Sequence, residues 1–370
     1  ILPNKWMKGG YGKALRNYAG KLNTLQMVDF GDLPVFEEAT TYPSLWFMTK
    51  KNVEVNTFEA AIADTLTYPN GMTAYLKDRW IKVSGESLTD ESWNLVDNRL
   101  QELMDKIKTA GKPLSEYLNG KIYRGVLTGY NEAFVIDTPT KDRLIQEDPR
   151  SAEIIKPFLA GRDIKRYQQP KSEKYLLFTR RGIEIDNYPA VVKQLEQFRS
   201  SLEPKPKNWT GTEWPGRKEG TYKWYEIQDA VDYYQDFEMS KIFYQEIASY
   251  STFVYDRKGI YSNNKLFFIP TENMALLGFL NSKLVWFYLN NTANGLRGAL
   301  ALQSPYILAL PFTEKLKNHL EISQIVNTVL ESKQNNPQEN TQTLETQIDQ
   351  LVYALYELTE EEIAIVEGRG

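Results

Sequence analysis

The chain has 370 residues, 42% of them hydrophobic and 25% charged, a composition typical of a globular protein with two or three structural units. It contains no cysteine and a single histidine, His319, which excludes disulfide bonds and thiolate or paired-histidine metal sites. No apolar run approaches the roughly 18 residues of a membrane span, so we expect a cytoplasmic protein without a membrane partner.

The net charge of −4 conceals an uneven distribution of charge along the chain. Residues 321–370 carry ten acidic and two basic side chains, so the rest of the chain is net positive. Because DNA affinity depends on the local patch rather than the net charge, a basic face toward DNA is compatible with this composition. An ordinary solvated surface is the alternative. The densest basic run has seven cations against two acids: Arg162, Lys165, Arg166, Lys171, Lys174, Arg180 and Arg181.

Residues 1–50 read as the last part of an α/β domain. Residues 1–7 are typical of the end of a buried strand, and a helix is predicted near Tyr11 to Ala19 with Leu15 and Tyr18 facing inward. Strands are predicted at Leu25 to Phe30 and Leu45 to Met48, the second apolar without alternation, as in a sheet covered on both faces. Since a sheet cannot begin with its last strands, we expect a fragment of a longer parent.

The next two segments are a connector and the start of a second unit. Residues 51–117 show a mixed, largely helical pattern, which predicts a helical connector. The second unit begins at Leu118, where Gly125 and Gly129 punctuate two short apolar runs. A phosphate-binding loop is one explanation, but the lysine and hydroxyl residue of that motif are missing, so a tight hairpin is favoured. A strand at Tyr175 to Thr179 and a helix near Val191 to Phe198 follow.

An aromatic and basic stretch runs from Trp209 to Tyr225. Four glycines and prolines within it break regular structure, which predicts an exposed loop. Aromatic rings beside cations suit stacking on bases together with neutralisation of phosphate. Tryptophans buried in a neighbouring core, or a sugar site, are alternatives of equal weight. The candidate DNA contacts in this loop are Trp209, Trp214, Arg217, Lys218, Tyr222 and Lys223.

The last third combines strands with helices. Lys241 to Ala248 is predicted as a strand, with Thr252 to Tyr255 and Leu266 to Ile269 as antiparallel neighbours and a turn at residues 261–264. Leu276 to Leu289 reads as one apolar helix, too short for a membrane. Apolar residues at helical spacing predict a further helix over 344–358, and Thr359 with Glu362 predicts a capping box that opens a last helix over 360–366.

Several motifs in the first fifty residues resemble one enzyme family. Residues 1–6, 28–31 and 42–44 resemble the final strands of gamma-class DNA adenine methyltransferases, above all those fused into type IIG restriction-modification enzymes. The cofactor motif and the catalytic Asn-Pro-Pro-Tyr motif of that family occur nowhere in the chain, so it should be inactive alone. The resemblance implies that Phe36 packs on a flipped target adenine, with an ordinary core phenylalanine as the alternative.

Residues 118–315 resemble the TaqI-like C-terminal specificity domain, the target-recognition domain of these enzymes. The resemblance lies in residues 120–136, 154–167, 296–298 and 303–307. It implies that double-stranded DNA is the partner and makes Arg162, Lys165 and Arg166 candidate phosphate contacts, a salt bridge to Asp163 being the alternative. We found no spaced Asp and Glu-x-Lys nuclease motif.

The sequence thus predicts an α+β chain in four parts: a methyltransferase remnant (1–50), a helical connector (51–117), a target-recognition domain (118–315) and C-terminal helices (316–370). The resemblance implies a parent that methylates adenine with S-adenosylmethionine and cuts DNA with magnesium, through methyltransferase and nuclease regions N-terminal to this chain. We expect no cofactor on the chain itself. A parent that only methylates, in phage defence, is one alternative, and a carbohydrate- or protein-binding module is another.

Overall fold

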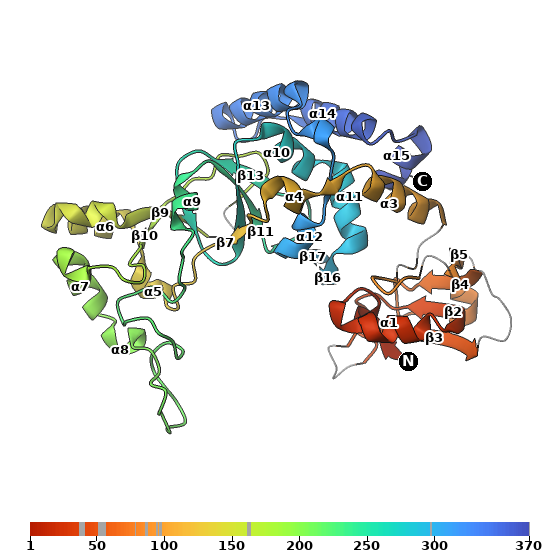
Figure 1. Cartoon of the computed structure of the whole chain (residues 1–370), viewed down its shortest axis with the longest axis horizontal. Helices are drawn as coiled ribbons and strands as arrows, with labels where there is room; N and C mark the ends of the chain where they lie inside the picture. The colour runs from red at the N-terminus through yellow and green to blue at the C-terminus, as the bar shows by residue number, and fades with distance from the viewer. Residues whose placement is uncertain are drawn as a thin grey trace.

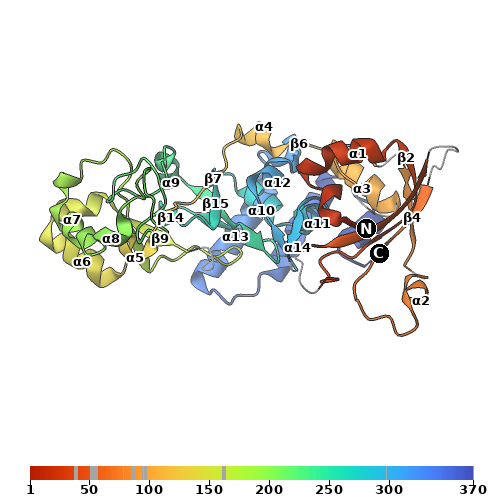
Figure 2. The ribbon, with the colours of Figure 1, turned by 90° about the horizontal axis from the view of Figure 1, so that it is seen from below.

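The computed structural model describes residues 1–36, 41–50, 57–77, 79–85, 88–93, 95, 98–160, 164–296 and 298–369. It is a mixed α/β structure with several sheets, which confirms the predicted fold class. Figure 1 shows the five-stranded N-terminal sheet at one end, the helices α6 (Thr138–Glu147) and α7 (Pro189–Glu196) at the other, and a sheet with long helices between them. The view from below in Figure 2 shows the same order, so the molecule is elongated.

The N-terminal sheet has the strand order β1-β3-β2-β4-β5. Its central strand β2 pairs antiparallel with β3 and parallel with β4. The core on one face contains Trp6, Trp46 and Trp93, whose ring centroids lie 5.0 to 5.7 Å apart. The elements of this unit are β1 (Leu2–Pro3), α1 (Lys13–Ala19), β2 (Leu22–Asp29), β3 (Pro43–Lys50), β4 (Thr57–Ile62), α2 (Met72–Leu76) and β5 (Ile81–Ser84).

This sheet corrects three sequence predictions. The helical connector expected over 51–117 instead supplies two strands, β4 and β5, to the N-terminal sheet. Tyr18, expected to face inward from α1, is 61% exposed, whereas Leu15 packs against the core. The second strand was expected to be covered on both faces, but Phe47 and Met48 on β3 are half exposed.

A central sheet with the order β13-β11-β15-β7 lies between two hydrophobic cores. Successive side chains of a strand point to opposite faces. On β11, Ile242 and Tyr244 therefore join one core, and Phe243 joins the other. The strands are β7 (Tyr123–Arg124), β11 (Lys241–Gln245), β13 (Phe253–Asp256) and β15 (Leu266–Pro270), and the predicted antiparallel pairing of the last three is confirmed.

The outer lobe consists of the helices and strands between residues 131 and 238 together with β14 (Tyr261–Ser262), and it packs on one face of the central sheet. Its own sheet has the order β14-β9-β10-β8, so the expected hairpin over 120–136 does not form, because β7 and β8 belong to different sheets. The residues expected as a turn at 261–264 supply β14, which pairs parallel with β9. The elements are α5 (Asn131–Phe134), β8 (Val135–Ile136), β9 (Ile155–Leu159), β10 (Lys174–Leu177), α8 (Arg199–Leu202), α9 (Tyr234–Glu238) and β14 (Tyr261–Ser262).

Helices cover the opposite face of the central sheet. The apolar stretch expected as one helix is divided at Ser282, because the Asn281 side chain bonds the Phe253 backbone and the Ser282 side chain caps a second helix. In the first of these helices, α10 (Met274–Asn281), Gly278 allows a close approach to α13 (Leu320–Asn335), since a Cβ at Gly278 would lie 2.8 Å from Ile322 Cγ2. The helices are α3 (Asn98–Thr109), α4 (Leu114–Leu118), α10 (Met274–Asn281), α11 (Lys283–Thr292), α12 (Ser304–Leu308), α13 (Leu320–Asn335), α14 (Gln342–Leu355) and α15 (Glu360–Val366).

The C-terminal helices share one core with α3, α10, α11 and the central sheet. The predicted boundaries at residues 51 and 316 therefore do not coincide with the boundaries of the cores. The capping box of Thr359 and Glu362 is confirmed. Short strands complete the fold: β6 (Lys112–Pro113) with β18 (Pro311–Phe312), and β12 (Ile247–Ala248) with β16 (Asn294–Leu296) and β17 (Ala299–Ala301).

Candidate nucleic-acid interface

The aromatic loop, residues 203–226, leaves α8 and returns to the outer lobe without a helix or a long strand, as predicted (Figure 1). A single bridge between Pro204 and Arg217 closes its base. The Arg217 amide donates to the Glu203 carbonyl at 2.9 Å, and the Lys205 amide donates to the Arg217 carbonyl at 3.0 Å. Residues 206–216 therefore project as a tip beyond a closed base.

Arg217 anchors this base from inside the protein. Its side chain is only 4% exposed, and burial lowers its pKa to about 10, so it stays charged at neutral pH. All five guanidinium N–H groups are used, which leaves none for a phosphate. The structure thus corrects the prediction that Arg217 contacts DNA. The acceptors are the backbone carbonyls of Thr128, Leu202, Lys223, Trp224 and Glu226, at 2.7 to 3.1 Å.

Tyr222 is likewise part of the base. It is 4% exposed, its hydroxyl donates to the Lys218 carbonyl, and the Arg217 guanidinium lies 4.3 Å from its ring centroid. Because both groups are enclosed, the predicted stacking of Tyr222 on DNA is also corrected. The buried carboxylate of Glu226 completes the base by accepting the Gly182 amide at 2.9 Å and the Lys223 amide at 2.8 Å.

Gly129 explains the glycine-punctuated stretch that precedes α5. Its φ of +82° lies in the left-handed region, which favours glycine. A Cβ at this position would lie 2.8 Å from Arg217 Cδ and 2.7 Å from Gln228 Oε1. The glycine therefore allows the backbone to pack against the anchoring arginine, and neither the hairpin nor the phosphate-binding loop accounts for it.

The loop presents to solvent the aromatic side chains of its tip and basic side chains that follow the tip in the sequence. Trp209 is 39% exposed and meets Trp214 edge-to-face, with ring centroids 5.0 Å apart. The Trp214 indole N–H donates to the Glu203 carbonyl at 3.0 Å, which fixes that ring over the base. Lys218 and Lys223 are exposed. These four side chains keep the accessibility that the predicted DNA contact requires.

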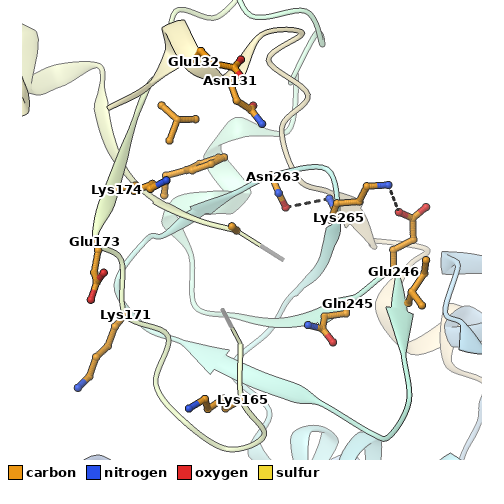
Figure 3. A pocket seen from close by; sticks show the side chains of 14 residues that line it. Asn131, Glu132, Lys165, Lys171, Glu173, Lys174, Gln245, Glu246, Asn263 and Lys265 are labelled. Atoms are coloured by element: carbon orange, nitrogen blue, oxygen red, sulfur yellow. Dashed lines mark hydrogen bonds and ion pairs between the residues drawn. The ribbon is translucent and has the colours of Figure 1, made fainter. Parts of the chain in front are cut away.

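A lysine-lined hollow of about 1070 Å³ lies between β9, β10 and the end of β11 (Figure 3). Its lining includes the cations Lys165, Lys171, Lys174 and Lys265, the acids Glu132, Glu173 and Glu246, and the amides Asn131, Gln245 and Asn263. Cations for phosphates together with amides for base edges are the donor set of a DNA-reading surface.

The cations of the hollow differ in their availability. Lys265 pairs with Glu246 at 3.2 Å. Among the residues that the structure describes, Lys165, Lys171 and Lys174 have no ion-pair partner, and all three are exposed. An exposed lysine without an ion-pair partner can neutralise a phosphate at little cost, because it gives up no existing pair.

The remaining residues of the predicted basic cluster are placed differently. Arg162 and Asp163 lie outside the described residues. Arg166 turns toward the C-terminal helices, where its guanidinium pairs with Glu345 on α14 at 2.7 Å. The structure thus corrects the assignment of Arg166 as a phosphate contact, because its charge is already matched by a half-buried carboxylate.

Phe36 lies in the N-terminal unit, after β2, and is 44% exposed. It lines neither the lysine-lined hollow nor a second hollow of about 530 Å³, where Asn4, Asp29 and Trp93 meet Trp286 and β16–β17. Residues 37–40 that follow it lie outside the described residues. Its role as a packing surface for a flipped adenine stays a prediction.

Sequence reasoning missed most of the hollow. Lys171 and Lys174 belong to the basic run but were not singled out, and Asn131, Gln245 and Lys265 carried no local signal. Only the pairing of β9 with β10 and the return of β11 and β15 bring them together. Among the described residues no group of three carboxylate or histidine side chains could hold a metal ion. In the same part of the chain no helix is long and apolar enough to span a bilayer.

Comparisons with known proteins agree with this architecture. No curated protein matches the sequence. The structure of the type IIL restriction-modification enzyme MmeI in complex with DNA superimposes with a TM-score of 0.59 at 12% identity, over 99% of this chain and 48% of that chain. The type IIG restriction endonuclease BpuSI gives a TM-score of 0.36 at 13% identity, over 96% of this chain and 47% of that one.

The chain thus spans about half the length of each of these enzymes, and its likeness to MmeI is one of fold. The family described as the TaqI-like C-terminal specificity domain matches residues 156–311. This range includes β11, β13 and β15 of the central sheet, the aromatic loop and most of the hollow. Residues 156–311 are therefore similar to the TaqI-like C-terminal specificity domain, as the motifs of the sequence implied.

Proposed function

We propose that this chain is the part of a restriction-modification enzyme that recognises a DNA sequence. The observation that carries the proposal is the match of residues 156–311 to the TaqI-like specificity domain. That range contains Lys165, Lys171 and Lys174 of the hollow, which have no ion-pair partner among the described residues, and the exposed tip of the aromatic loop. MmeI, whose fold this chain shares, was solved in complex with DNA.

In this proposal the lysines and the amides of the hollow have different tasks. Lys165, Lys171 and Lys174 hold phosphates, which sets the position of the duplex without reading its sequence. The amides of Asn131 and Asn263 in the hollow suit adenine, because an amide can donate to N7 and accept from N6 of that base.

We further propose that the parent methylates the exocyclic amine of adenine with S-adenosylmethionine, and that an N-terminal nuclease region cuts DNA with magnesium. The resemblance of residues 1–50 to adenine methyltransferases supports the first part, and the likeness to MmeI supports the second. Such a parent would act in the cytoplasm, and its cofactors would bind outside this chain. A parent that methylates without cutting would use this domain in the same way.

The first test is the salt dependence of binding to random-sequence duplex DNA, measured by fluorescence anisotropy between about 50 and 200 mM salt. We expect a steep loss of affinity as salt rises. In the double variant Lys171→Gln and Lys174→Gln, the slope of log affinity against log salt should become shallower by about 1 for each lysine, since each phosphate contact releases about one counterion.

The control is a second double variant, Lys315→Gln and Lys333→Gln, which removes the same charge from the C-terminal segment. Its slope should equal that of the unmodified chain. Equal slopes in all three proteins would show that the hollow does not bind phosphate. An affinity independent of salt would instead favour a carbohydrate- or protein-binding module.

A further inference from the structure

The tip of the aromatic loop has the construction of a rigid wedge. Its base is fixed by the five hydrogen bonds of Arg217 and by the Pro204 bridge. Near the tip, the Trp209 amide donates to the Pro206 carbonyl at 3.1 Å, which makes a tight turn. Because the base is already ordered, little conformational entropy is lost when the tip enters a binding partner.

The tip itself is aromatic and is maintained by a glycine. The Trp209 indole packs against Gly211, where a Cβ would come within 2.5 Å of Cζ2. The Trp214 ring also packs against Trp209, with ring centroids 5.0 Å apart, and is itself held by the hydrogen bond from its indole N–H to the Glu203 carbonyl. Trp209 nonetheless keeps 39% of its surface in solvent, which is unusual for a large aromatic residue that already has two packing partners.

Two lysines flank the aromatic pair in the sequence. Lys207 and Lys218 are exposed and, within the described part of the chain, have no ion-pair partner. Exposed aromatic rings with a lysine on either side of them in the sequence suit a nucleic acid, in which base faces alternate with phosphates. A buried hydrophobic anchor would need no such cations.

We propose that Trp209, supported by Trp214, is a wedge that enters a base step of duplex DNA and stacks on an unstacked base. This inference rests on the proposed DNA-binding function and adds the ligand of the loop tip. Lys207 and Lys218 hold the phosphates beside the opened step, as cations do where apolar side chains unstack a duplex. Arg217 and Glu226 are positioning residues that aim the wedge and do not touch DNA.

The test compares two labelled duplexes by fluorescence anisotropy, one intact and one with a central abasic-site analogue that leaves a gap in the stack. A wedge binds the gapped duplex more tightly because the step is already open. We expect a preference of about tenfold for the unmodified chain, the scale of one aromatic stacking contact. The preference should disappear in Trp209→Ala and largely return in Trp209→Phe.

Two controls isolate the tip. Tyr250→Ala removes an exposed aromatic residue elsewhere in the domain, at 60% exposure, and should leave the preference unchanged. Gly211→Ala should weaken the preference by displacing the Trp209 indole, whereas Gly10→Ala, where a Cβ meets open space, should not.

The outcomes separate this inference from the proposed function. Salt-dependent binding of the intact duplex without any preference for the gapped one would overturn the wedge and leave the proposed function standing. A preference that survives in Trp209→Ala would also overturn it. Failure to bind either duplex at the lowest salt would overturn both.

Discussion

Two buried charges illustrate how single residues are set by their surroundings. The Lys241 ammonium and the Asp256 carboxylate are fully buried and 2.6 Å apart, in register across β11 and β13. Burial lowers the pKa of Lys241, and the nearby Asp256 opposes this shift. The carboxylate also accepts the amides of Lys258 and Ile260, so both members of the pair have several partners. Such a pair is costly to break but adds little net stability.

Asp349 is a buried carboxylate whose pKa is raised from 3.8 to about 6, chiefly by burial. Below pH 3.8 it is protonated in both the folded and the unfolded state. Between pH 3.8 and 6 the unfolded chain loses the proton first, so this group destabilises the fold as pH rises, by on the order of 3 kcal/mol in total.

We expect Asp349→Asn to be more stable than the unmodified chain above pH 6. The Lys283 backbone N–H donates to the Asp349 carboxylate at 2.8 Å, and the side-chain oxygen of asparagine can accept the same hydrogen bond without burying a charge. Urea unfolding at pH 4, 5, 6 and 7 should show the difference growing with pH. The exposed carboxylate of Asp186 offers a control, and Asp186→Asn should show no such trend. A stability difference that is constant with pH would contradict the assignment.

At the scale of elements, the aromatic loop and the divided helix show side chains replacing secondary structure. The loop has no ladder of its own, so Arg217 supplies hydrogen bonds to five carbonyls that strands or helices would otherwise satisfy. Asn281 does the same at the edge of β13 by bonding both the amide and the carbonyl of Phe253 at 2.9 Å. In both cases one side chain fixes the path of a segment.

We expect Arg217→Lys to cost about 3 kcal/mol of unfolding free energy, because lysine has at most three donors and cannot reach carbonyls on both sides of the loop. Chemical denaturation would measure this loss. Arg143→Lys is the matched control, since Arg143 makes an exposed pair with Glu147 and should change stability by less than about 0.5 kcal/mol. Equal effects of the two substitutions would argue against an anchoring role.

At the scale of the whole molecule, the central sheet joins the outer lobe to the helical layer. Both its faces are buried, so neither the outer lobe nor the helical layer has a complete core without it. The C-terminal helices belong to the same body, through Ile322 and Val326 of α13 and through the pair between Arg166 and Glu345. The acidic end of the chain is therefore a structural layer.

We expect a chain that ends at His319 to fail to fold. The removed helices bury at least Ile322, Val326, Val329, Ile348 and Val352. Burial of each side chain contributes about 1.5 to 3 kcal/mol, so their total is comparable to the usual 5 to 15 kcal/mol of unfolding free energy. Soluble yield and circular dichroism would test this. A chain that ends at Val366 is the control and should fold, because it keeps α15. A folded, soluble product of the shorter chain would show that the helices form a separate domain.

Local patterns and motif order were enough to predict the mixed α/β class, strands within 241–256 and 266–270, the capping box at Thr359, and the similarity of residues 156–311 to the TaqI-like specificity domain. Exposure of Trp209 and burial of Arg217 could not be distinguished there, since both lie in one stretch of the same composition. Only the tertiary structure decided that Arg217 faces inward, that Arg166 meets Glu345, and that Lys171 and Lys174 share a hollow with Asn263. The reason is physical: these contacts join residues up to 179 positions apart, and their partners are set by the packing of sheets and not by any local preference.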